Sequence, residues 1–141
     1  MDGPSRHRVR SLPEVRLVED EYKWVDIVIN NIDDYGYPFH LHGNSFYVLA
    51  SHAPETESIE PFNSFSHMSP AGRPLNTVDP VTKDTVFVPG RGYVVLRLKA
   101  DNRGLWFLQS QTLWGQAIGM ATALQVGDGK ANTNAAELCN T

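Results

Sequence analysis

The sequence lacks the features that define several large protein classes. Cys139 is the only cysteine, so no disulfide can form within the chain and a disulfide-stapled secreted module is excluded. The 12 Lys and Arg residues against 16 Asp and Glu give a formal net charge of −4, which provides no basic surface for phosphates. No apolar run approaches the ~20 residues that a membrane-spanning helix needs. We therefore expect neither nucleic acid nor a membrane among the partners.

An export signal and glycosylation acceptors are also missing from the sequence. The N-terminal residues contain charges but no apolar segment of the kind that forms a signal peptide. No asparagine begins an Asn-x-Ser/Thr triplet, the acceptor for N-glycosylation. These absences predict a cytoplasmic protein, and a chain whose leader had been removed would look the same.

Length and composition indicate one domain. The chain has 141 residues, and 41% of them are apolar, which is enough to fill a single core. We expect a flexible basic arm over residues 1–14, one domain over residues 15–128 and a polar tail over residues 129–141. A short helix over residues 133–138 is an open alternative within that tail.

Short apolar and β-branched runs separated by Gly, Pro and Asn predict an all-β domain. Residues 33–38 have the composition of a turn. The proline-rich segment over residues 52–84 predicts a long irregular excursion that is functional or faces a partner. Strands at this spacing predict an antiparallel two-sheet sandwich or barrel. The expected strands lie at residues 15–32 (one or two strands), 46–50, 85–88, 93–98, 105–108 and 120–126.

One segment resembles a known copper motif. Tyr37-Pro38-Phe39-His40-Leu41-His42-Gly43 is similar to the His-Pro-x-His-Leu-His-Gly segment of multicopper oxidases such as the fungal laccases. The resemblance continues through residues 75–80, 84–97 and 100–106, and so covers roughly residues 22–127. Their order is that of the C-terminal domain of a laccase. The resemblance implies a cupredoxin-like Greek-key β-sandwich, here without the two further domains that family members have.

The resemblance also implies that the copper motifs are degenerate. In the family, the first motif and a second one, His-Cys-His-x-x-x-His-x-x-x-x-Met/Leu, together hold a blue (type 1) copper and part of a trinuclear cluster. Carried over to this sequence, Ser110 replaces the thiolate ligand, Tyr37 and Gly115 replace the two type 1 histidines, and Met120 remains as the axial ligand. A neutral hydroxyl does not replace a thiolate. We therefore expect no cofactor and no oxidase activity from this chain by itself.

The trinuclear positions retain two histidines. His40 and His42 remain, while Gln109 and Gln111 stand where the family has the histidines that flank its cysteine. The glutamines could pair with the histidines in a structural network, or form a polar wall for a ligand. His40 and His42 could also bind copper or zinc weakly, because two ligands do not make a closed metal site.

Our leading functional hypothesis is a repurposed ligand site. The former copper cleft would hold a small aromatic metabolite, phenolic or polyketide-like, of the kind found in secondary metabolism. A metal-independent step such as isomerisation, cyclisation or dehydration could follow there. Trp106 is expected in the core instead. The catalytic candidates are His40, His42 and Tyr37, and the candidates for ligand contact are Phe39, Gln109, Ser110, Gln111, Trp114 and Met120.

Two other classes of function stay open at this point. The chain could be a non-catalytic partner of another cupredoxin protein, or a homo-oligomer, because a domain separated from its usual neighbours exposes apolar surface. It could also be a weak copper- or zinc-binding protein through His40 and His42. Cys139 is then a free thiol or forms an intermolecular disulfide.

Overall fold

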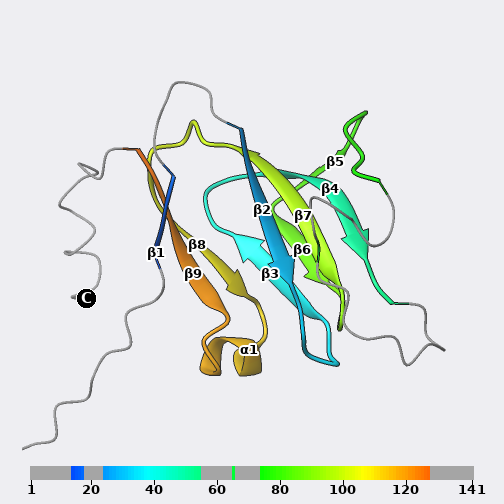
Figure 1. Ribbon diagram of the computed structural model, residues 1–141. Helices are drawn as coiled ribbons and strands as arrows, with labels where there is room; N and C mark the ends of the chain where they lie inside the picture. The colour runs from blue at the N-terminus through cyan, green and yellow to red at the C-terminus, as the bar shows by residue number, and fades with distance from the viewer. Residues whose placement is uncertain (1–13, 18–23, 55–64, 66–73, 128–141) are drawn as a thin grey trace, which may run out of the picture.

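The computed structural model describes residues 14–17, 24–54, 65 and 74–127, which form a sandwich of two β-sheets (Figure 1). One sheet has the strand order β1-β9-β8-β3-β6 and the other has the order β2-β7-β4-β5. The predicted all-β sandwich is thereby confirmed. The elements are β1 (Glu14–Leu17), β2 (Trp24–Asn30), β3 (Tyr37–Leu41), β4 (Phe46–His52), β5 (Val81–Lys83), β6 (Thr85–Val88), β7 (Tyr93–Lys99), β8 (Gly104–Ser110), α1 (Leu113–Ala117) and β9 (Ala121–Val126).

The main core lies between the two sheets. Its centre is β7, which pairs with β2 on one side and β4 on the other and whose sequence YVVLRLK is almost wholly buried. Alternate residues of β7 point to opposite faces of its sheet, so Val94, Leu96 and Leu98 join the inter-sheet core. Tyr93 and Val95 point the other way, where Phe65 and Leu75 from the proline-rich excursion cover them. The excursion therefore closes a second, smaller core.

Four features differ from the sequence prediction. The expected turn at residues 33–38 ends earlier, because Tyr37 and Pro38 belong to β3 and pair with β6. β1 pairs with β9 in parallel rather than antiparallel, which is feasible because nearly the whole domain separates the two strands in sequence. A short strand, β5, lies inside the excursion, and a short helix, α1, precedes β9. Residues 1–13 of the expected arm (1–14) and the whole expected tail (129–141), with its helix and Cys139, lie outside the described residues, whereas Glu14 begins β1.

Trp106, which the sequence predicts for the core, is partly buried and packs against the main core. Its indole N–H donates a hydrogen bond to the backbone carbonyl of Asn102 at 2.9 Å. In the part of the chain that the structure describes, no helix has the length and apolar character needed to cross a membrane.

A buried asparagine joins two turns at one end of the sandwich. The Nδ2 group of Asn31 donates hydrogen bonds to the carbonyl oxygens of Tyr35 at 2.8 Å and Pro89 at 3.0 Å, and its Oδ1 accepts one from the N–H of Asp33 at 3.0 Å. The two turns lie so close that a Cβ at position 90 would overlap the carbonyl of Asp34, which explains the glycine there. Asn31 thus holds the β2–β3 turn against the β6–β7 turn and positions the start of β3.

Replacing Asn31 by Ala is expected to destabilise the domain by about 1–3 kcal/mol, because two carbonyl oxygens in partly buried hydrogen bonds lose their donor. The matched control is Asn102→Ala, since Asn102 is exposed and its side chain makes one hydrogen bond, to the carbonyl of Gly43. Urea denaturation of both variants measures the free energy of unfolding. Equal losses in the two variants would contradict the role given to Asn31.

Candidate functional site

Strand β3 divides the residues predicted for the site between two faces of its sheet. Tyr37 and Leu41 are buried and Phe39 packs against the main core, so these three side chains point between the sheets. Because side chains alternate along a strand, His40 points to the outer face. The ring of His42 lies 5.9 Å from the ring of His40, on that same face. The structure therefore does not bring together His40, His42 and Tyr37, the three predicted catalytic candidates.

The inner face opens into a cavity of about 770 Å³ between β2 and the strands β3, β8 and β9. Three predicted ligand-contact residues or catalytic candidates line this cavity: Tyr37, Phe39 and Met120. Most of the remaining lining is aliphatic, with Ile27 and Ile29 on β2 facing Leu108 and Leu124. The cavity can accordingly accept an apolar molecule of moderate size.

A phenol–carboxylate pair forms the polar end of the cavity. The hydroxyl of Tyr37 donates a 2.6 Å hydrogen bond to Oδ2 of Asp33, which also lines the cavity. This hydrogen bond raises the pKa of Tyr37 above its usual value, and burial raises it further. The same hydrogen bond lowers the pKa of Asp33. At neutral pH the pair is a neutral phenol beside a charged carboxylate.

Sequence reasoning did not single out Asp33. The residue lies in the β2–β3 turn, four positions before Tyr37, and the composition of that segment predicts only a turn. The bend brings the two side chains together. An acidic residue and a tyrosine four positions apart across a turn are the sequence pattern that could have indicated this pair.

The positions that resemble a type 1 copper site form a tight hydrogen-bonded unit. The N–H of Ser110 donates to the carbonyl of Met120 at 2.9 Å, and the N–H of Met120 donates to the carbonyl of Gly115 at 2.8 Å. The hydroxyls of Ser110 and Thr112 are hydrogen-bonded at 3.0 Å. Thr112 also accepts from the N–H of Gly115 at 3.1 Å and thereby caps α1.

This unit does not fit a type 1 copper. A Cβ at position 115 would overlap the hydroxyl of Ser110, so a side chain where the family has a histidine requires Ser110 or α1 to shift. The hydroxyls of Tyr37 and Ser110 and the thioether of Met120 supply neither a thiolate nor an imidazole. Across the described part of the chain, no group of three or more His, Cys, Asp or Glu side chains is gathered that could hold a metal ion.

On the outer face, a hydrogen-bond chain orients His40. The hydroxyl of Thr85 donates to Asp84 at 3.0 Å and also lies 3.0 Å from Nδ1 of His40. Since a hydroxyl has one hydrogen, Thr85 accepts from the Nδ1–H of His40, and the neutral form of this imidazole carries its lone pair on Nε2. Gln109 is the register partner of His40 across β3 and β8, but the hydrogen bond described for the imidazole goes to Thr85.

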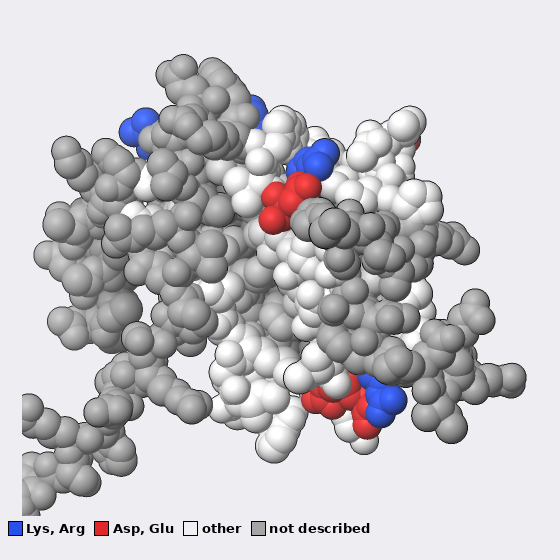
Figure 2. All heavy atoms as spheres, viewed as in Figure 1, with Lys and Arg blue, Asp and Glu red and all other residues white. Residues whose placement is uncertain are grey.

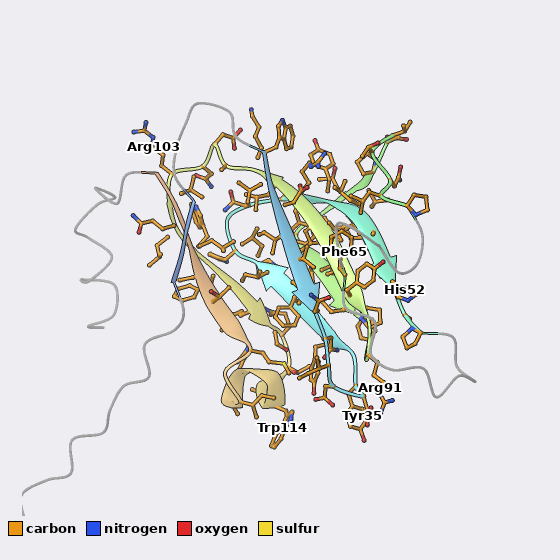
Figure 3. The ribbon with its side chains drawn as sticks, in the orientation of Figure 1. Tyr35, His52, Phe65, Arg91, Arg103 and Trp114 are labelled. Carbon is orange, nitrogen blue, oxygen red and sulfur yellow. The ribbon has the colours of Figure 1, made fainter. Side chains whose placement is uncertain are left out.

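The other three predicted residues lie away from the cavity lining. Ser110 is fully buried within the hydrogen-bonded unit, and Gln111 is exposed while its backbone N–H donates to the carbonyl of Pro38 at 2.8 Å. Trp114 lies on α1 with 67% of its surface exposed, and Figure 3 shows it at the end of the molecule, pointing away from the sandwich. Of the residues predicted for the site, only Tyr37, Phe39 and Met120 therefore line the cavity between the sheets.

Comparison with known proteins places these features in a family. The family model described as "Multicopper oxidase" matches residues 10–130. The chain is 38% identical over 102 residues to an iron transport multicopper oxidase, FET3, of Candida albicans, covering 71% of this chain and 15% of that protein. It is 33% identical over 120 residues to Laccase-2 of Botryotinia fuckeliana, covering 84% of this chain and 18% of that protein. The chain thus spans less than a fifth of the length of these relatives.

Solved structures show the same architecture. The crystal structure of Fet3p, a multicopper oxidase that functions in iron import, superposes with a TM-score of 0.68 at 29% identity, covering 89% of this chain and 25% of that one. The laccase from Botrytis aclada superposes with a TM-score of 0.66 at 27% identity, covering 89% of this chain and 22% of that one. The cupredoxin-like sandwich expected from the sequence is confirmed.

Protein incubated with Cu(II) is expected to show no intense visible band from thiolate–copper bonding, and Ser110→Cys is expected to show none either. A cysteine at position 110 would lie against Gly115. Gly115 and Tyr37 stand at the positions where the family has its two imidazoles, so the trigonal His₂Cys geometry is missing. Absorption spectra recorded during copper titration measure this, with an intact laccase as the positive control. An intense blue band in either protein would show that the site accepts type 1 copper.

Proposed function

This chain belongs to the multicopper oxidase family, and we propose that its domain binds a small aromatic molecule in the cavity between the two sheets. The observation that supports this proposal is the cavity itself, with a volume of about 770 Å³. Ligand pockets in proteins measure roughly 300–1,000 Å³ and are mostly apolar, with a few polar groups that orient the ligand. The Tyr37–Asp33 pair supplies such polar groups at one end.

The lining favours a flat aromatic ring. Phe39 contributes an aromatic surface from β3, and the side chains of Ile27 and Ile29 lie opposite it on β2. Aromatic pairs gain energy beyond the burial of area alone. The thioether of Met120 adds a polarisable group that makes favourable contacts with ring edges and adapts to irregular shapes.

A metal-independent reaction of the bound molecule would rely on few groups. Tyr37 is the proton donor that reaches the cavity, with Asp33 as its hydrogen-bond acceptor, whereas His40 and His42 face the opposite side of the sheet. An isomerisation, cyclisation or dehydration in this cavity would use Tyr37 as the general acid only after its hydroxyl hydrogen leaves Asp33. Binding requires only a complementary cavity, whereas turnover also requires groups that transfer protons. Binding is therefore tested first.

The protein is expected to bind 2-naphthol, and Ile27→Trp is expected to weaken this binding at least about tenfold, equivalent to about 1.4 kcal/mol. The larger ring would occupy cavity volume beside Phe39. Isothermal titration calorimetry measures the affinity, and melting temperatures show that each variant folds. Tyr47→Trp is the control, because Tyr47 packs against the second core and does not line this cavity. Unchanged affinity in Ile27→Trp, or no binding to the unaltered protein, would refute the proposal.

We also propose that the outer face of the β1-β9-β8-β3-β6 sheet docks onto another cupredoxin domain. Phe87, Leu105 and Phe107 are 60%, 48% and 41% exposed, and strand alternation places them on one face with His40. A solvated sheet face is normally polar, so apolar side chains in such a group mark an interaction surface. The family relatives are several times longer than this chain, which supports a further domain of the same family as the partner.

Weak copper binding would follow from docking. His40 and His42 present two imidazoles on the outer face, with Nε2 of His40 free to coordinate a metal. Two ligands make an incomplete site, so the remaining donors would have to come from the docked domain.

The double variant Phe87→Asp, Phe107→Asp is expected to lose association with a second cupredoxin domain, because two charges would be buried in an apolar contact. Sedimentation velocity with a cupredoxin domain of a relative measures the complex. Leu113→Asp is the control, since Leu113 is an exposed apolar residue on α1 outside this sheet face. Self-association of the unaltered chain would identify a homo-oligomer instead. A monomer at tens of micromolar with no complex would contradict the docking.

A further inference from the structure

We infer that the outer edge of β2 accepts one additional β-strand from a different polypeptide, whose alternate apolar side chains enter the cavity between the sheets. Two features meet there: β2 ends its sheet among the described strands, and an apolar cavity runs beside it. This inference goes beyond the proposed function, which concerns the end of the cavity that holds Tyr37 and Asp33. The added strand would take the side of the cavity along β2.

β2 differs from the other strands that end a sheet in the described part of the chain. β1 and β6 have four residues each and β5 has three, whereas β2 has seven. Edge strands are protected from pairing with other chains when they are short or carry proline or lysine. β2, with the sequence WVDIVIN, contains neither residue, and its one charge, on Asp26, is paired with Arg97. Its edge is therefore a template on which a further strand can pair.

The backbone hydrogen bonds of β2 show which of its groups face this edge. β2 pairs with β7 in an unbroken antiparallel register, and just beyond the strand the N–H of Asn31 donates to the carbonyl of Gly92 at 2.9 Å. Because the direction of hydrogen bonding alternates along an antiparallel strand, the N–H and C=O groups of Ile29 also point to β7. Those of Val28 and Asn30 consequently point to the outer edge. Such a row of donors and acceptors matches the backbone of another strand.

The cavity follows the same edge. All of residues 25–33 border it, and alternate side chains of a strand point to opposite faces, so the cavity must run along the backbone of β2 as well as beneath it. Across it lie apolar residues such as Leu108 and Leu124. Its volume of about 770 Å³ far exceeds the voids of a close-packed protein interior. The inward side chains of an added strand would occupy this space beside Ile27 and Ile29.

The charge distribution favours a strand with an apolar inner face. Figure 2, in the view of Figure 1, shows mainly uncharged surface along β2, with acidic and basic side chains together near its two ends. A charge on the inner face of the added strand would be buried among aliphatic side chains, which is costly without a partner.

A second copy of this chain matches the site less well than a strand from a different polypeptide. A twofold contact brings the same surface of both copies together, so β2 would meet β2 and each cavity would adjoin the other. The apolar side chains of β2 that face inward, Val25, Ile27 and Ile29, already pack against their own core. They would leave both cavities unfilled, whereas a separate strand brings side chains of its own.

A synthetic peptide tests this inference on the full, unaltered chain. The peptide Lys-Val-Thr-Leu-Thr-Val-Lys, with blocked ends, alternates polar and apolar residues as a strand with one apolar face does. Its control, Lys-Thr-Thr-Val-Leu-Val-Lys, has the same composition without the alternation. Isothermal titration calorimetry is expected to show at least about tenfold tighter binding of the alternating peptide, equivalent to about 1.4 kcal/mol.

Two N-methylated forms of the alternating peptide separate backbone pairing from the burial of side chains. One form carries methyl groups on its even-numbered amides and the other on its odd-numbered amides, so only one of them blocks the N–H groups that face β2. We expect one form to lose at least about tenfold in affinity while the other retains it. Equal affinities of the two forms would show that no strand pairing occurs and would overturn the inference.

Amide hydrogen exchange locates the bound peptide. Saturating peptide is expected to slow exchange of the Val28 and Asn30 amides at least about tenfold, because these N–H groups gain acceptors. Ile29 is the control on the same strand, since its N–H already points to β7, and we expect a smaller change there. Unchanged exchange at Val28 and Asn30 in the presence of bound peptide would contradict strand addition at this edge.

The possible outcomes separate this inference from the proposed function. If 2-naphthol binds and the alternating peptide does not, the proposed function stands and the inference is overturned. If the peptide binds and protects Val28 and Asn30 while 2-naphthol does not bind, the inference stands and the proposed function fails. Self-association of the unaltered chain that protects the same amides without peptide would identify a second copy as the occupant and overturn the inference.

Discussion

Alternation along β3 is the constraint on which both proposed surfaces depend. The strand lies inside its sheet, paired with β6 and β8, so its residues must point either into the sandwich or away from it. Neighbouring residues of this short motif consequently lie either in the interior of the sandwich or on its outer face. Tyr37 and Phe39 belong to the interior and its cavity, whereas His40 belongs to a face that another domain can cover. Within one chain, the two surfaces can thus change independently of each other.

The β2–β3 turn connects the stability of the domain to the polarity of its cavity. Asn31 holds this turn against the β6–β7 turn, and Asp33 and Tyr37 follow within the next few residues. The hydrogen bonds that stabilise the turn are also those that consume the donors at the cavity end. Side chains held by such hydrogen bonds are preorganised, because they lose little conformational entropy when a ligand binds.

Much of the fold could be predicted from local sequence, and the exceptions have physical causes. The β-branched run of β7 identifies a strand because both of its faces are buried, and local composition suffices there. β3 contains a proline and follows a glycine, so only its pairing with two distant strands makes it a strand. The family resemblance identified Tyr37, Phe39 and Met120 for the pocket, but without β3 as a strand it could not separate His40 and His42 from them. Asp33 depends on a bend that composition does not show.

The packing of Gly115 against Ser110 also limits the order in which this sequence can change over evolutionary time. A Cβ introduced at position 115 would overlap the serine hydroxyl, so that substitution requires the Ser110 side chain or α1 to shift. Thr112 adds to this dependence, because it hydrogen-bonds to both residues. Substitutions that are each acceptable in a relative would thus be harmful singly here, and the three positions are expected to vary together among descendants of this chain.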